Sequence, residues 1–102
     1  MSETKGVLDG VKVLDLSRVL AGPYCAAQLA DLGADVVKIE SPRGDDARGL
    51  GPFKDKESVY FAILNRNKRS VTMNLKDEGD KAAFMDLVRE ADVLIENYRP
   101  GV

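Results

Sequence analysis

Residues 19–40 read Val-Leu-Ala-Gly-Pro-Tyr-Cys-Ala-Ala-Gln-Leu-Ala-Asp-Leu-Gly-Ala-Asp-Val-Val-Lys-Ile-Glu, the main part of a strand-to-helix-to-strand unit. Pro23 suits the first helical position because its missing N–H is not needed there, and Gly33 supplies the left-handed residue that ends a helix. Apolar runs at 11–16 and 36–39 flank this helix and read as short buried strands. We expect the two strands to lie parallel, joined by a right-handed crossover.

The helix that starts at Pro23 should pack one face on the sheet. Cys25, Leu29 and Leu32 recur at i, i+4 and i+7, so they share a face that we expect to be buried. A thiol near a helix start can have a lowered pKa. The chain has no histidine to act as its base, so we interpret Cys25 as a small core residue rather than a nucleophile.

The next part of the chain reads as a loop, a short helix and a strand. Residues 41–57 carry two prolines and three glycines among eight charged side chains, which is typical of a long surface loop. Ser58 should cap a short helix that runs to Leu64, with Ile63 on its buried side. Residues 71–75 alternate between apolar and polar side chains, as a half-exposed strand near a sheet edge does.

The second long helix is predicted over residues 78–91, with Asp77 as its amino-terminal cap. The apolar side chains that would face the sheet are Phe84, Leu87, Val88 and Ala91. Residues 93–95 form the last strand. This alternation of strands and helices predicts an α/β domain, with a largely parallel sheet of about four strands and flanking helices.

Composition narrows the classes of function. The 102 residues suffice for one domain, and 15 basic against 17 acidic side chains lack the basic excess of nucleic-acid binders. Without histidine the chain cannot build a histidine triad or a histidine metal site, and we expect no metal. One cysteine excludes an internal disulfide. No apolar run approaches the roughly 18 residues that span a bilayer, and no signal-peptide core is present, so we expect a cytoplasmic protein without membrane contact.

In an open parallel sheet, ligands bind beyond the carboxyl ends of the strands. The segments that reach this edge in the predicted fold are residues 17–22, 40–48, 75–76 and 96–99. The helix that starts at Pro23 directs its free N–H groups to the same edge, which favours an anion. No glycine-rich dinucleotide or phosphate-loop pattern is present, so a dinucleotide-binding domain is the weakest interpretation.

Several polar groups near this edge allow two interpretations each. The following cations could bind a ligand with several phosphates or form a solvated face: Arg66, Lys68, Arg69 and Lys76. Glu40 lies where a dinucleotide fold has its ribose-binding acid, but we favour a solvated carboxylate or a salt bridge to the loop arginines. Asp45 and Asp46 favour loop-ordering ion pairs over a metal. The residues after the last strand could contact a nucleotide or form a plain loop: Asn97, Tyr98 and Arg99.

Six blocks of the sequence together resemble the opening of the family III coenzyme A transferases, the group that contains the carnitine, bile-acid and formyl-CoA transferases. The blocks are Leu-Asp-Gly-Val-Lys-Val-Leu-Asp-Leu-Ser-Arg-Val-Leu-Ala-Gly-Pro at 8–23, Leu-Gly-Ala-Asp-Val-Val-Lys-Ile-Glu at 32–40, Gly-Asp-Asp-x-Arg at 44–48, Asn-Arg-Asn-Lys-Arg-Ser at 65–70, Asn-Leu-Lys at 74–76 and Ala-Asp-Val-Leu-Ile-Glu-Asn-Tyr-Arg-Pro-Gly at 91–101. The resemblance covers nearly the whole chain, in order.

The resemblance implies that residues 1–102 are the amino-terminal part of a Rossmann-like CoA-binding domain, with no second domain among them. Members of the family are much longer, and two subunits thread through each other. They move CoA from an acyl-CoA to a carboxylic acid through intermediates linked to an aspartate. That aspartate is expected beyond residue 102, so this chain is expected to contain no catalytic residue and to be inactive alone. CoA is the only cofactor implied.

The resemblance also implies which residues contact CoA. They are Val19, Leu20 and Ala21 on the adenine side, Met73 and Lys76 around the third strand, Asn97 and Tyr98 after the fourth, and Arg99 toward a phosphate. Some members have an arginine directly after the position of Glu40. This chain has Ser41 and Pro42 there, so Arg43 is the candidate for that contact.

Two alternatives to a transferase segment remain. The α-methylacyl-CoA racemases share the fold and much of this opening, although Arg-Val-Leu-Ala-Gly-Pro at 18–23 favours a transferase. The chain could also be a non-catalytic product that binds CoA or associates with itself. A sheet of this size exposes strand edges and apolar surface, so we expect a homodimer or self-association.

Overall fold

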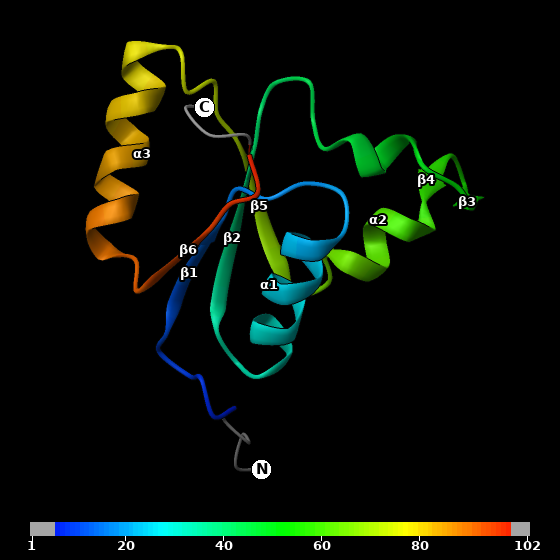
Figure 1. The fold of residues 1–102 in the computed structure, drawn as a ribbon, viewed down its shortest axis with the longest axis horizontal. Helices are drawn as coiled ribbons and strands as arrows, with labels where there is room; N and C mark the ends of the chain where they lie inside the picture. The colour runs from blue at the N-terminus through cyan, green and yellow to red at the C-terminus, as the bar shows by residue number, and fades with distance from the viewer. Residues whose placement is uncertain (1–5, 99–102) are drawn as a thin grey trace.

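The computed structural model describes residues 6–98, which form an open α/β fold (Figure 1). Four strands make the central sheet: β1 (Lys12–Asp15), β2 (Asp35–Glu40), β5 (Lys68–Thr72) and β6 (Val93–Ile95). Their order is β5-β2-β1-β6, and all three neighbouring pairs run parallel. The predicted α/β class, the parallel pairing of the first two strands and the position of β5 at a sheet edge are confirmed.

Helices cover both faces of the sheet. Figure 1 shows α1 (Ala21–Asp31) and α2 (Val59–Leu64) on one side and α3 (Glu78–Glu90) on the other. The chain winds from β1 through β2 to β5 on the α1 side and then returns through α3 to β6, which pairs with β1. The winding direction therefore reverses between β1 and β6, and ligands of such sheets bind at this switch point.

Small side chains make the contact between α1 and the sheet. The buried positions of this helix are Gly22, Pro23, Ala26, Ala27 and Ala30. The predicted face was wrong, because Cys25 is exposed, Leu32 is 46% exposed and Leu29 lies only at the margin of the core. Periodicity selected the bulky residues, whereas the close approach of α1 to Val13 and Val36 leaves room only for alanine.

The helix over 78–90 confirms the prediction closely. The Asp77 side chain accepts a hydrogen bond from the Asp80 N–H at 3.0 Å and so caps α3. The predicted apolar stripe packs on Leu14, Leu16 and Ile39 of the opposite sheet face, with the side chains Phe84, Leu87, Val88 and Ala91. None of the residues of α3 is fully buried, so this face of the sheet is less well covered than the α1 face.

The segment 41–57 is more ordered than the predicted surface loop. It contains a 3-10 helix, η1 (Asp46–Gly49), and a hairpin of β3 (Phe53–Lys54) and β4 (Glu57–Ser58). Ser58 caps α2 as predicted and accepts a hydrogen bond from the Phe61 N–H at 3.0 Å. Ile63, predicted to face inward, is 56% exposed, because the short helix buries Leu64 instead.

Glu40 anchors this segment to the sheet. Arg48 donates two hydrogen bonds to its carboxylate, from Nε at 2.9 Å and from Nη2 at 2.6 Å. The Asp45 N–H and the Ser70 hydroxyl donate to the same carboxylate at 3.0 and 2.9 Å. These donors, Arg48 first, lower the pKa of Glu40 to about 2 against the opposing effect of burial. The salt bridge to a loop arginine is thus confirmed.

No helix in residues 6–98 is long and apolar enough to cross a membrane. The same residues contain no group of three or more acidic, cysteine or histidine side chains arranged to hold a metal ion.

The tight α1 contact predicts a strong size limit at Ala26, which is fully buried. Ala26→Leu should reduce the free energy of unfolding by about 1–3 kcal/mol, because the added carbons have no space between helix and sheet. Urea denaturation measures this change. Ala82→Leu on the exposed side of α3 is the matched control and should change the value by less than about 0.5 kcal/mol. Equal effects of the two substitutions would contradict the packing described here.

The Glu40 pair predicts a specific pH dependence of stability. The folded pKa is about 2 against an ordinary value of 4.5, so the pair stabilises the fold above pH 4.5 and this contribution disappears as the pH falls toward 2. Glu40→Gln should lower the free energy of unfolding at neutral pH by about 1–2 kcal/mol, a value reduced for the exposure of Arg48. Urea denaturation at several pH values should show this difference shrinking below pH 4.5. A difference that is constant from neutral pH to pH 2 would contradict it.

Candidate functional site

The site lies at the switch point, where the loop 17–20 after β1 meets residues 96–98 after β6. Asn97 joins the two segments, since its Oδ1 accepts a hydrogen bond from the Arg18 N–H at 3.0 Å and its Nδ2 donates to the Arg18 carbonyl at 2.9 Å. The beginning of α1 packs so tightly on this loop that a Cβ at Gly22 would lie 2.1 Å from the Ser17 Cβ. Glycine at position 22 is therefore required by packing.

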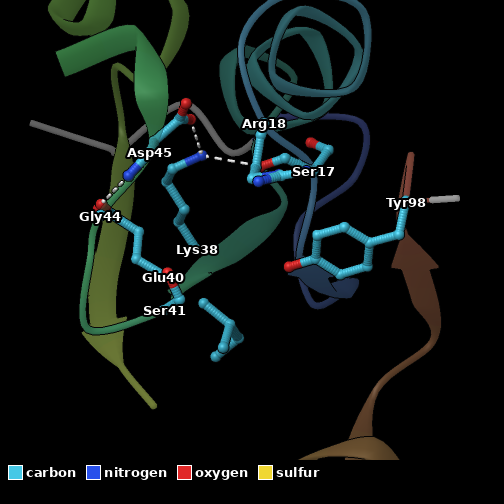
Figure 2. A pocket seen from close by; sticks show the side chains of 9 residues that line it. Ser17, Arg18, Lys38, Glu40, Ser41, Gly44, Asp45 and Tyr98 are labelled. Carbon is cyan, nitrogen blue, oxygen red and sulfur yellow. Dashed lines mark hydrogen bonds and ion pairs between the residues drawn. The ribbon is translucent and has the colours of Figure 1, made fainter. Parts of the chain in front are cut away.

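Two cavities open at this edge. The first has a volume of about 310 Å³ and is lined by Arg18, Val19, Leu20, Ala21, Asp46 and Asn97. The second has a volume of about 280 Å³ and is lined by Arg18, Ile39, Ser41, Met73, Asn74, Leu75, Lys76 and Tyr98. Arg18 lines both. Figure 2 shows a much smaller pocket, of about 10 Å³, in which Arg18 and Tyr98 meet the end of β2.

Most of the predicted contact residues line these cavities. Val19, Leu20, Ala21 and Asn97 lie around the first cavity, and Met73, Lys76 and Tyr98 around the second. Arg43 is exposed and lines neither of them. Arg99 lies outside the described residues. The fold thus brings together seven of the predicted positions from three separate loops.

Arg18 is the site residue that the sequence analysis did not select. Its guanidinium carbon lies 5.2 Å from the centroid of the Tyr98 ring, within the range of a cation–π contact. Within residues 6–98 neither Arg18 nor Lys76 has a salt-bridge partner. The sequence offered one signal, the position of Arg18 in the loop that follows the first strand.

Tyr98 contributes a neutral phenol to the second cavity. Burial raises the pKa of its hydroxyl, and the nearby Arg18 cation offsets only part of this effect. The phenol therefore remains protonated at neutral pH and presents a hydrogen-bond donor beside the guanidinium.

Three of the four basic residues for which the sequence left an anion site open are paired with acids. Arg66 pairs with Asp31 at 2.6 Å, and Arg69 pairs with Asp35 at 2.8 Å, so both are neutralised by acids of α1 and β2. Lys68 begins β5, three residues earlier than the predicted strand, and its buried ammonium lies 2.6 Å from Asp15. Burial lowers the pKa of Lys68, and the Asp15 contact partly restores it. Of the four cations, only Lys76 lines a cavity at the candidate site.

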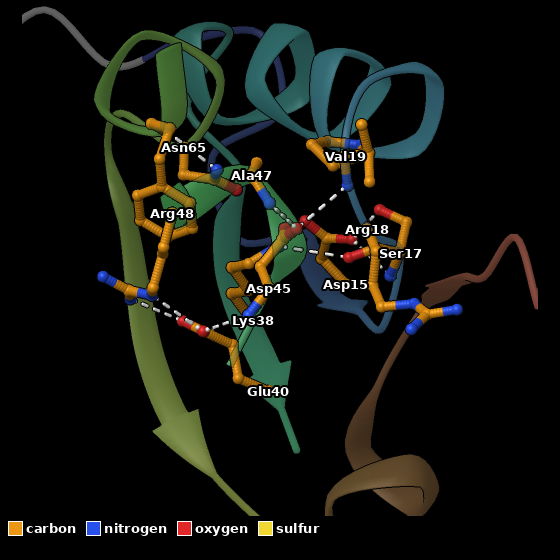
Figure 3. A network of polar contacts seen from close by, with 12 residues as sticks. Asp15, Ser17, Arg18, Val19, Lys38, Glu40, Asp45, Ala47, Arg48 and Asn65 are labelled. Carbon is orange, nitrogen blue, oxygen red and sulfur yellow. Dashed lines mark hydrogen bonds and ion pairs between the residues drawn. The ribbon is translucent and has the colours of Figure 1, made fainter. Parts of the chain in front are cut away.

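A buried polar network is hydrogen-bonded to the backbone of the loop 17–20 (Figure 3). The Ser17 N–H donates to Asp15 at 2.9 Å, and Lys38 Nζ donates to the Ser17 carbonyl at 3.1 Å. The same ammonium lies 2.9 Å from Asp45 Oδ2, and Asp45 Oδ1 accepts hydrogen bonds from the Val19 and Ala47 N–H groups at 3.1 and 2.9 Å. Asp45 therefore orders the loop, the role that the sequence favoured over metal binding.

Comparison with known proteins identifies the family of this chain. Residues 8–102 match the sequence pattern of CoA-transferase family III. The chain is 53% identical over 102 residues to acetyl-CoA:oxalate CoA-transferase of Acetobacter aceti and 52% identical over 101 residues to succinyl-CoA:mesaconate CoA-transferase of Haloarcula marismortui. These matches cover 99% and 94% of this chain, and 26% of each relative.

The fold also matches that of a solved structure. A CAIB/BAIF family protein from Brucella suis superposes with a TM-score of 0.89 at 46% identity, over 96% of this chain and 27% of that one. The chain thus spans about a quarter of the length of the relatives that it matches. Because the family pattern matches residues 8–102, nearly the whole chain, the chain belongs to CoA-transferase family III.

Proposed function

We propose that the chain is the amino-terminal CoA-binding part of an enzyme that moves CoA from an acyl-CoA to a carboxylic acid through an aspartyl-linked intermediate. Membership of the family and the transferase names of the relatives support this class of reaction over a racemase. The observation that carries the proposal is the pair of cavities at the switch point, joined by Arg18. Because the chain spans a quarter of its relatives, we propose that catalysis requires further residues, including the aspartate.

The distribution of charge suggests how CoA would lie. The second cavity is lined by Arg18 and Lys76 and by no acid, so it suits the phosphates. The first cavity includes the carboxylate of Asp46, which would repel a phosphate, and the largely apolar side chains of residues 19–21. This division agrees with an adenine-side role for Val19, Leu20 and Ala21.

Titration calorimetry with CoA tests the proposal. We expect saturable binding by the chain, weakened roughly fivefold to tenfold by Lys76→Ala and by Arg18→Ala, since each removes a cation that faces the phosphates. Binding of 3′-dephospho-CoA should also be weaker, and added salt should weaken the binding of CoA. Lys81→Ala on the exposed side of α3 is the matched control and should leave affinity unchanged. Equal losses in Lys81→Ala and Lys76→Ala, or no binding by the folded chain, would contradict the proposal.

We also propose that the chain associates with a second copy and acts in the cytoplasm, as the sequence predicts. Support comes from β6, which pairs with β1 along one side only among the described strands. Val93 and Leu94 on this strand are 39% and 44% exposed. An apolar edge strand with unpaired backbone groups favours association, whereas the polar residues of β5 make that edge less suitable.

Sedimentation velocity at increasing micromolar concentrations should show self-association of the chain. Leu94→Lys should reduce it, because a charge on an edge strand opposes pairing with another chain. Met85→Lys is the control, since Met85 is 43% exposed but belongs to α3 and not to a strand. A monomer at all concentrations, or equal effects of the two substitutions, would contradict association through β6.

A further inference from the structure

Val19 adopts a backbone conformation that its side chain disfavours. Its φ angle is +70°, in the left-handed region, which is a rare outlier for a β-branched residue. Such a conformation persists only where the surrounding contacts hold it. Val19 lines the first cavity and directly precedes Leu20 and Ala21, which line it too, so the conformation of this residue sets the shape of that wall.

The contact that holds Val19 comes from a distant part of the chain. The Val19 N–H donates to Asp45 Oδ1 at 3.1 Å, across 26 residues of sequence. The same oxygen accepts the Ala47 N–H at 2.9 Å, which fixes Asp45 at the start of η1. Asp45 is 4% exposed, so water does not compete for this acceptor. Leu20, the residue before α1, makes no side-chain capping bond that could substitute for it.

Lys38 neutralises the buried charge of Asp45 and also binds the backbone of the loop at Ser17. It is 1% exposed, and its ammonium lies 2.9 Å from Asp45 Oδ2 and donates to the Ser17 carbonyl at 3.1 Å. Asp45 Oδ2 has no other polar partner among the described residues. The pair is therefore hydrogen-bonded to the loop at two backbone positions: Lys38 donates to the Ser17 carbonyl, and Asp45 accepts from the Val19 N–H.

We infer that Asp45, whose burial the Lys38 ammonium permits, is a positioning residue: its Oδ1 holds Val19 in its left-handed conformation and thereby keeps residues 19–21 in place as the wall of the first cavity. Neither side chain lines that cavity, so the pair acts on a ligand through the backbone of the loop. The effect of Asp45 on CoA affinity rests on the proposed function.

The test compares two double variants that both lack the buried charges. Lys38→Met with Asp45→Asn keeps an oxygen that can accept the Val19 N–H. Lys38→Met with Asp45→Leu has a side chain of the same branched shape at position 45 and offers no acceptor. Using amide hydrogen exchange followed by NMR, we expect the Val19 amide to exchange at least tenfold faster in the leucine variant than in the asparagine variant. The Asp35 amide, which bonds to the Val11 carbonyl at 2.9 Å, reports general stability and should differ less than twofold.

The outcomes separate positioning from general stability and from CoA binding. Equal exchange of the Val19 amide in the two variants, or an equal acceleration of Val19 and Asp35, would overturn the inference. CoA affinity should be at least fivefold lower in the leucine variant than in the asparagine variant if the proposed function holds. If the unaltered chain does not bind CoA, the proposed function fails for this chain, while the exchange data still decide whether the Asp45 acceptor positions the loop. If it does bind, equal affinities of the two variants would overturn the link to the cavity.

Discussion

Two acids and two lysines are buried together on the α1 side of the sheet, and the loop of the candidate site depends on their mutual neutralisation. The side chains of Asp15, Lys38, Asp45 and Lys68 are each no more than 2% exposed and form two ion pairs. Removing charges from water is costly, and a buried pair often contributes little net stability compared with apolar side chains of similar size. What such a pair can specify is a single arrangement, because loss of either partner leaves an unpaired buried charge. Here the arrangement joins the end of β1, the strand β2 and the segment that leads into η1.

Sequence reasoning succeeded where local rules decide the structure. The cap at Asp77, the stripe on α3, the cap at Ser58 and the parallel strands all follow from short-range patterns, and all are confirmed. It failed where distant contacts decide. The buried face of α1 was misassigned because helical periodicity does not report how closely a sheet approaches. The cations of residues 66–69 looked unpaired because their partners, Asp15, Asp31 and Asp35, lie 34 to 53 residues away in the sequence.

At the candidate site, too, the features set by local patterns were predicted and those set by distant contacts were not. Strand ends could be located from the sequence, so the loops that would meet at the carboxyl edge were identified correctly, and seven of the predicted contact positions line the two cavities. Arg18 was not selected because its importance comes from topology. It matters only once β6 is known to lie beside β1, which brings Asn97 to its backbone and Tyr98 to its guanidinium. The resemblance to a family supplied the ligand that we propose, CoA, which the residue pattern alone left open.

The unequal covering of the two sheet faces has a consequence for the behaviour of the site. Helix α1 contributes buried residues of its own to the core, whereas none of the residues of α3 is buried, so α3 and β6 should open at lower free energy than the rest. Yet the candidate site is built from both parts: Arg18 follows β1, whereas Asn97 and Tyr98 follow β6. If β6 detached, the site would lose Asn97 and Tyr98 even though β1, β2 and α1 stayed folded. A ligand that contacts both Arg18 and the residues after β6 binds only while β6 is attached. Binding of such a ligand would therefore stabilise the attachment of α3 and β6 to the rest of the fold.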